Sequence, residues 1–125
     1  MSPKTVLSAA VLDVLVVLVF VVIGRSSHAE GITVSGIAET LWPFLAGTVI
    51  GWVACLAWRA PISVPRTGVP VWLATLVLGM VLRVVSGQGT EVSFIIVAGI
   101  FLGVFLLGWR AIALLLIRRR KPVSS

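Results

Sequence analysis

Four long apolar runs constrain the fold of this chain more than any other feature. They cover about residues 6–23, 41–58, 69–85 and 92–117. Each run reaches roughly the 17 residues that a helix needs to cross about 30 Å of hydrocarbon. Inside a bilayer only a helix or a closed barrel satisfies its own backbone, and the runs lack the alternation of barrel strands. We therefore predict an all-α integral membrane bundle of four transmembrane helices.

The composition leaves no room for a separate soluble domain. Of the 125 residues, 59% are hydrophobic and 11% are charged, whereas a soluble domain is about half apolar and about a quarter charged. Four spans use about 80 residues, so short connections and a basic cytoplasmic tail over residues 118–125 account for the rest. We interpret residues 1–125 as a single transmembrane domain.

Basic residues are divided unevenly between the two sets of loops, which predicts the orientation. The N-terminus, the link between the second and third runs, and the C-terminus hold Lys4, Arg59, Arg66, Arg118, Arg119, Arg120 and Lys121. The other loops hold Arg25, with Arg83 just inside the third run. Short loops rich in Lys and Arg stay in the cytoplasm, so we expect both termini there. Arginine outnumbers lysine eight to two, which is typical of a GC-rich bacterial genome. We expect the chain in the bacterial inner membrane.

The first run has a second interpretation, as a cleaved signal peptide. Lys4 precedes it, and Ser27-His28-Ala29 offers a small-x-small cleavage site. The run is longer than the usual 7–15 or so residues of a signal peptide, and it contains Asp13. These two features favour a retained helix.

Two charged residues are expected at membrane depth, where each costs roughly 2.5–3.5 kcal/mol on insertion scales. Asp13 lies seven residues after Val6, and Arg110 lies seven residues before Ile117. At a helical rise of about 1.5 Å per residue, both lie about 10 Å from the cytoplasmic boundary. Equal depth and opposite sign predict a pair, for which we favour a structural role over a proton relay. The alternative for Arg110 is that its side chain extends to the headgroups.

Small residues recur at four-residue spacing and define three helix faces. These faces hold Gly47 and Gly51, then Thr75 and Gly79 with Arg83 one turn further on, and then Gly99 and Gly103. Such faces let two helices approach closely. We expect them to pack against another helix, within the chain or in another copy. Arg110 shares the face of Gly99 and Gly103, which directs it into the bundle.

A second polar cluster is expected at the outer end of the bundle. Its members are the charged or titratable residues Arg25, His28, Glu39, Arg83 and Glu91. The simpler interpretation of the two glutamates is that they begin helices and complement the helix dipole. The more specific hypothesis is a pocket for an anion, a lipid headgroup or a partner loop, in which His28 titrates near neutral pH.

No set of residues has the composition or spacing of a catalytic or metal site. The chain holds one histidine and one cysteine, Cys55, so neither metal ligation nor a nucleophile with its base is predicted. We expect no enzymatic activity and no cofactor. The net charge is +6, and the basic residues lie at the edges of the apolar runs. This placement indicates a role in topology and lipid contact and argues against nucleic-acid binding. The expected partners are anionic headgroups at Arg118, Arg119, Arg120 and Lys121.

A weak internal repeat links the two halves of the chain. Phe44-Leu45 precedes Gly51-Trp52 by the same interval that separates Phe101-Leu102 from Gly108-Trp109. Two parallel helical hairpins would produce this pattern. Chance similarity between apolar segments is the alternative.

The polar residues also resemble the pattern of a known family. The resemblance is carried by Asp13, Gly24-Arg25-x-x-His28, Pro43-Phe44, Gly79-x-x-x-Arg83 and Trp109-Arg110. Together they look like the bacterial family called domain of unknown function 3054, over about residues 6–110. The resemblance implies a small multi-pass membrane protein, of a kind common in actinobacteria. It assigns no activity and no catalytic residue.

Three hypotheses for function follow from these features. The first is a small accessory or scaffold protein that packs with itself or with a larger membrane complex. The second is a small oligomeric transporter or permeation unit that uses buried Asp13, Arg83 and Arg110. A membrane enzyme acting on lipid comes third, because the histidine has no evident partner for catalysis.

Overall fold

A computed structural model of the chain describes residues 3–27, 33–88 and 91–120 and contains four long helices. They are α1 (Pro3–Ser27), α2 (Val34–Ala54), α3 (Val69–Val85) and α4 (Val92–Arg120). A 3-10 turn, η1 (Ala57–Arg59), and a short π-helix, η2 (Val64–Gly68), lie in the link between α2 and α3. These described residues contain no strand. The predicted all-α bundle of four helices is therefore confirmed.

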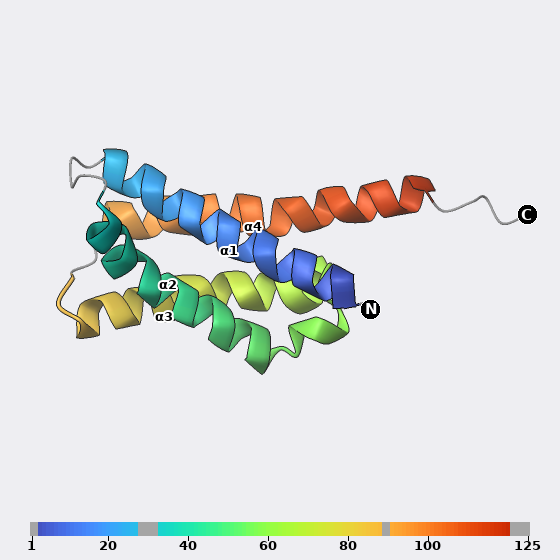
Figure 1. Cartoon of the computed structure of the whole chain (residues 1–125), viewed down its shortest axis with the longest axis horizontal. Coiled ribbons are helices and arrows are strands. Elements are labelled where there is room, and N and C mark those ends of the chain that lie inside the picture. The colour runs from blue at the N-terminus through green and yellow to red at the C-terminus, as the bar shows by residue number, and fades with distance from the viewer. Residues whose placement is uncertain (1–2, 28–32, 89–90, 121–125) are drawn as a thin grey trace, which may run out of the picture.

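Consecutive helices run in opposite directions and form a closed ring (Figure 1). The helix α1 packs against α2 and α4, and α3 packs against the same two neighbours. The α2–α3 contact is the most extensive of the four, and the α1–α4 contact is the least extensive. The start of α1, the α2–α3 link and the end of α4 therefore lie at one end of the bundle, which we call the basic end.

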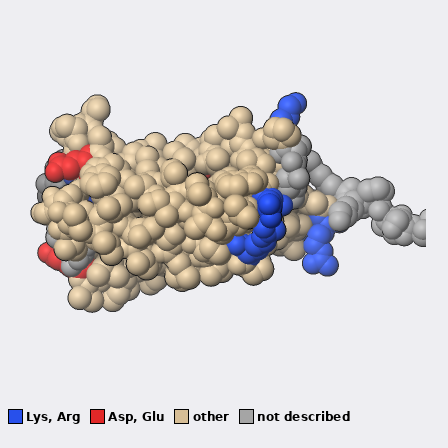
Figure 2. Space-filling model, turned by 90° about the horizontal axis from the view of Figure 1, so that it is seen from below, with Lys and Arg blue, Asp and Glu red and all other residues tan. Residues whose placement is uncertain are grey.

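The surface of the bundle is apolar between its two ends. All four helices are long and apolar enough to cross a membrane. Large hydrophobic side chains such as Leu7, Val49, Val77 and Ile100 are more than half exposed. Figure 2 shows basic groups at one end and acidic groups at the other, with an uncharged band between them. The fold is that of a multi-pass membrane protein whose outer surface suits lipid.

Aromatic rings fill the centre of the bundle toward the end opposite the basic end. Phe20 of α1 packs against Phe44 of α2, with ring centroids 5.4 Å apart and an edge-to-face geometry. The ring centroids of Phe94 and Phe101, both on α4, lie 5.8 and 5.6 Å from the ring centroid of Phe20. Such arrangements suit the quadrupoles of the rings. Side chains from three helices thus fill this part of the interior.

The five glycines that were expected to pack against helices all face neighbouring helices of the same chain. A Cβ on Gly47 would lie 2.8 Å from the carbonyl oxygen of Ala74, and one on Gly103 would lie 3.1 Å from the indole of Trp72. Gly51, Gly79 and Gly99 likewise face residues of α2 or α3. Close approach of α2 and α4 to α3 therefore depends on these positions.

The observed bounds of α2 differ from the predicted range of 41–58. The helix begins earlier, at Val34, because the side chain of Thr33 accepts a hydrogen bond from the Gly36 N–H and caps the end. It ends earlier, at Ala54, because Leu56 adopts a left-handed conformation with φ 54°. The predicted run missed the start because Ser35, Glu39 and Thr40 interrupt its apolar character.

The fourth helix continues past the predicted end at residue 117. It reaches Arg120, so residues 118–120 of the predicted tail form its last turn. A cation there complements the partial negative charge of the helix C-terminus. Lys121 and the rest of the predicted tail lie outside the described residues.

Candidate functional site

A fully buried pair of charged residues joins the first and last helices near the basic end. Asp13 of α1 and Arg110 of α4 are both 0% exposed. The guanidinium contacts the carboxylate through two bonds, from Nη2 to Oδ2 at 2.6 Å and from Nη1 to Oδ1 at 2.9 Å. This is a bidentate ion pair, the strongest arrangement of these two groups. The two residues singled out for equal depth lie in direct contact.

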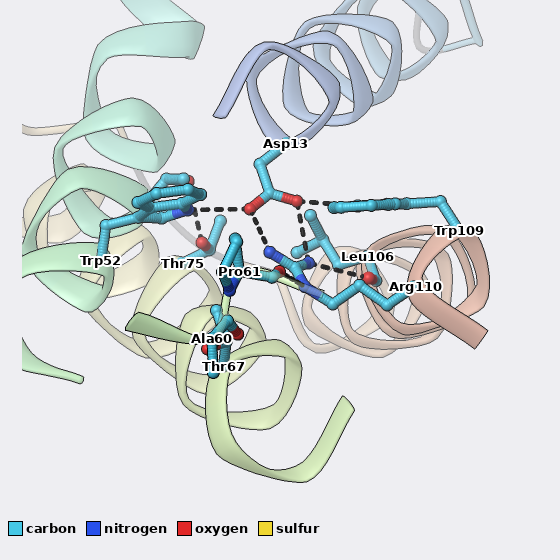
Figure 3. Close-up of polar contacts among 10 residues, drawn as sticks. Asp13, Trp52, Ala60, Pro61, Thr67, Thr75, Leu106, Trp109 and Arg110 are labelled. Carbon is cyan, nitrogen blue, oxygen red and sulfur yellow. Dashed lines mark hydrogen bonds and ion pairs between the residues drawn. The ribbon is translucent and has the colours of Figure 1, made fainter. Parts of the chain in front are cut away.

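Two tryptophans complete the environment of the carboxylate (Figure 3). The indole of Trp52, on α2, donates to Oδ2 of Asp13 at 2.8 Å. The indole of Trp109, on α4, donates to Oδ1 at 2.9 Å. Each carboxylate oxygen therefore accepts one bond from Arg110 and one from an indole. The ring of Trp109 also lies 4.5 Å from the Arg110 guanidinium carbon, a cation–π distance.

The remaining bonds of Arg110 go to backbone carbonyls. Its Nε donates to the carbonyl of Pro61 at 2.9 Å, and Nη1 also donates to the carbonyl of Leu106 at 2.9 Å. Pro61 belongs to the α2–α3 link, at the basic end of the bundle. The link is held in turn by buried Thr67, whose hydroxyl donates to the carbonyl of Ala60 at 2.6 Å. The site thus joins α1, α2, α4 and the link.

The charges and the hydrogen-bonding groups of the site are balanced within the protein. The charges of Asp13 and Arg110 cancel, and among the described residues every buried side-chain nitrogen or oxygen has a hydrogen-bond partner. A buried ion pair is tolerated only when such additional bonds offset its desolvation. No group of three or more potential metal ligands occurs in the described part of the chain. The described partners of Asp13 and Arg110 are thus all side chains or backbone groups of the protein.

At the opposite end, the structure brings Arg25 and Arg83 to the same small cavity. Its volume is about 20 Å³, and Phe20, Thr40 and Phe94 also line it. Arg25 donates to the Thr40 hydroxyl at 2.9 Å. Arg83 donates to the side chain of Gln88 at 3.1 Å, and its guanidinium carbon lies 4.7 Å from the ring centroid of Phe94. The two arginines lie at the ends of α1 and α3.

The glutamates expected in this cluster lie outside the cavity. Glu39 is exposed and lies in the second turn of α2, which begins at Val34. Its interpretation as a helix-starting residue was therefore wrong. Glu91 is exposed and directly precedes α4, where its carbonyl accepts the Ile95 N–H at 3.0 Å. His28 lies outside the described residues.

Sequence reasoning missed the roles of the two indoles and of the Pro61 carbonyl. A signal for the indoles was the matching spacing that places Gly51-Trp52 after Phe44-Leu45 and Gly108-Trp109 after Phe101-Leu102. Both tryptophans lie at the depth of Asp13, and both donate to it. The Pro61 contact had no such signal, since a backbone carbonyl carries no sequence information.

Comparison with known proteins identifies one relationship. The model of a family described as "Protein of unknown function (DUF3054)" matches residues 10–113, a range that includes Asp13, both indoles and Arg110. Neither the curated proteins nor the solved structures contain a match to this chain.

Proposed function

The chain belongs to the DUF3054 family of proteins of unknown function, and from the geometry of its buried site we propose that it is a small accessory or scaffold protein of the bacterial inner membrane. In this role it packs with itself or with a larger membrane complex through its lipid-facing surface. It provides a rigid helical surface and carries out no chemistry of its own.

The saturation of Asp13 is the observation that carries this proposal. A carboxylate that relays protons or binds a substrate needs an open position on one of its oxygens. Here each oxygen already accepts two hydrogen bonds, and neither Asp13 nor Arg110 is exposed. Opening the site would leave a desolvated charge, which costs several kcal/mol. A carboxylate with both oxygens fully hydrogen-bonded supports a structural role for Asp13.

The charge distribution supports an orientation with both termini in the cytoplasm. Lys4, Arg59, Arg66 and Arg118 are exposed at the basic end, whereas Glu39 and Glu91 are exposed at the other end. Lysine and arginine in short loops are retained on the cytoplasmic side. The basic end therefore faces the cytoplasm in our proposal.

A second candidate function, an oligomeric transporter or permeation unit, has one observation in its favour. The indole of Trp109 donates to Asp13 on one side and lines a hollow of about 480 Å³ between α1 and α4 on the other. The side chain of Trp109 thus lies between this surface hollow and the ion pair. A path through this point would require the indole to move.

Two measurements on the same protein separate these functions. A photoreactive residue is placed at exposed Ile100 or Val49 in cells, with the buried position Val17 as the control. A scaffold gives one adduct of constant mass from an exposed position and none from the control. Proteoliposomes of the purified chain are then compared with protein-free vesicles for proton and chloride flux.

The scaffold proposal predicts equal flux from both kinds of vesicle. Flux from the proteoliposomes above that of protein-free vesicles would instead support the permeation unit. An absence of any adduct, together with no flux, would contradict both proposals.

A further inference from the structure

A groove follows the seam between α1 and α4, the neighbouring helices with the least extensive contact. Its wider part, at the basic end, has a volume of about 480 Å³ and is lined among others by Lys4, Ser8, Ile62, Trp109, Ala113 and Leu116. A second hollow of about 270 Å³ continues toward the middle of the bundle and is lined among others by Val16, Val19, Phe101 and Phe105. Leu12 lines both hollows, so they adjoin.

The groove changes from polar to apolar along its length. Lys4, Thr5 and Ser8 lie at the basic end, and among the described residues they are the only charged or hydroxyl residues in its lining. The inner hollow is lined by aliphatic and phenylalanine side chains alone. This order matches a phospholipid, whose phosphate lies at the membrane boundary and whose acyl chain points to the middle of the bilayer.

The charges around the mouth of the groove favour an anion. Lys4 is a charged lining residue, and exposed Arg118 and Arg119 follow closely after the lining residue Leu116 on α4. In the part of the chain that the structure describes, no carboxylate lines either hollow. Each basic residue near a membrane surface attracts anionic lipid by about 1 kcal/mol.

We propose that this groove binds one anionic phospholipid of the leaflet at the basic end, with the phosphate at Lys4 and an acyl chain between Leu12 and Phe105. A second copy of the chain is a poorer occupant. A symmetric pair of α1–α4 seams would bring Lys4, Arg118 and Arg119 of both copies to the same depth, and like charges there repel. The lipid site does not depend on the proposed accessory role.

Trp109 connects the lipid groove to the buried ion pair. Its indole donates to Asp13 while the same residue lines the wide part of the groove. A lipid bound there covers the wall of the site that Trp109 forms. Because a ligand that binds only the folded chain raises its stability, the lipid also stabilises the bundle.

The test is native mass spectrometry of the full chain purified in mild detergent, with added dioleoyl phosphatidylglycerol or dioleoyl phosphatidylcholine. The expected result is one bound lipid per chain and a preference for phosphatidylglycerol of about fivefold, the factor that about 1 kcal/mol corresponds to. Lys4→Gln should remove most of this preference. Arg59→Gln is the matched control, because Arg59 is an exposed cation at the same end that does not line the groove.

The apolar part of the site is tested by filling it. Ala113→Phe places a ring in the groove and should lower retention of both lipids severalfold. Ala111→Phe is the control, since Ala111 lies on the same helix, is exposed and is not among the lining residues. If Ala113→Phe fails to fold, as judged by gel filtration, the Lys4 and Arg59 comparison still decides.

Equal retention of the two lipids by the unaltered chain would overturn the proposal. So would an equal loss of preference in Lys4→Gln and Arg59→Gln. A dimer peak that Ala113→Phe removes, without bound lipid, would assign the groove to a second copy of the chain and would likewise overturn it.

Discussion

Asp13 is acceptable inside a membrane only because other side chains fill its hydrogen-bonding positions. Burying an unpaired charge at this depth costs several kcal/mol, and an ion pair with additional hydrogen bonds offsets part of this desolvation cost. The four donors to Asp13 come from Arg110, Trp52 and Trp109. Removing one partner of the ion pair should therefore destabilise the bundle more than replacing both partners together.

The first prediction concerns the ion pair. Asp13→Asn or Arg110→Leu alone should lower the free energy of unfolding by about 3–5 kcal/mol, because each leaves an uncompensated buried group. The double variant Asp13→Leu with Arg110→Leu should recover much of this loss. The measurement is the folded fraction by gel filtration and the thermal midpoint in detergent. Losses that simply add in the double variant would contradict a coupled pair.

The second prediction compares two indoles by the charge of their acceptors. Trp109→Phe removes a bond to a carboxylate and should cost about 1.5–3 kcal/mol. Trp72→Phe removes a bond from the indole to the neutral carbonyl of Gly99, at 2.9 Å, and should cost about 0.5–1.5 kcal/mol. Both changes keep an aromatic ring, so thermal midpoints in one detergent give the comparison. An equal or reversed order would show that the bond to Asp13 contributes little.

The ion pair could be predicted from residues alone, whereas its surroundings could not. Opposite charges at matching depth in the first and last apolar runs leave few other stable arrangements. The direction of an indole depends on helix rotation and side-chain rotamer, which hydropathy does not encode. The contact with the Pro61 carbonyl depends on the path of the α2–α3 link, which contains Pro61 and Pro65. Glu39 was misplaced because the polar first turn of α2 does not look like a membrane helix.

At the scale of the helices, the close approach of α2 to α3 rests on glycine. The space at Gly47 ends at backbone atoms of Ala74 and Thr75, which have little freedom to move. At Gly99 the nearest atom is the end of the Leu76 side chain, at an ordinary contact distance of 3.4 Å. The two sites therefore differ in what they tolerate although both are helix-interior glycines.

The third prediction follows from this difference. Gly47→Ala should destabilise the bundle by about 1–3 kcal/mol, the usual cost of overpacking. Gly99→Ala should be neutral or stabilising by up to about 1 kcal/mol, because alanine is the better helix former. Thermal unfolding of the two variants beside the parent chain tests this. A stable Gly47→Ala variant would mean that α2 and α3 can separate without loss.

The apolar runs predicted the number and order of the helices. They did not predict the residues at which the helices begin and end. A span must be long and apolar, so its existence is visible in the sequence. A helix end depends on local capping, such as the hydroxyl of Thr33 or the left-handed Leu56. The π-helix of the α2–α3 link, Val64–Gly68, lies directly before α3 and was not predicted.

The fourth prediction concerns the whole molecule and its orientation. Reporter fusions after Pro61 and after Lys121 should report the cytoplasm, and a fusion after Gln88 should report the outer side. The physical reason is the excess of Lys and Arg at the basic end. Paired phosphatase and fluorescent-protein reporters provide the measurement. A cytoplasmic signal at Gln88 would contradict the proposed orientation of α3 and α4.

The ion pair also has a consequence for biosynthesis. Asp13 and Arg110 are 97 positions apart along the chain, and α1 leaves the ribosome long before α4. During that interval the carboxylate has no guanidinium, and the indole of Trp52 on α2 is the first of its partners to be synthesised. The arrival of α4 supplies the opposite charge and the second indole. A chain interrupted before α4 therefore differs chemically from a finished one, and a membrane protease that recognises polar groups in lipid could distinguish the two.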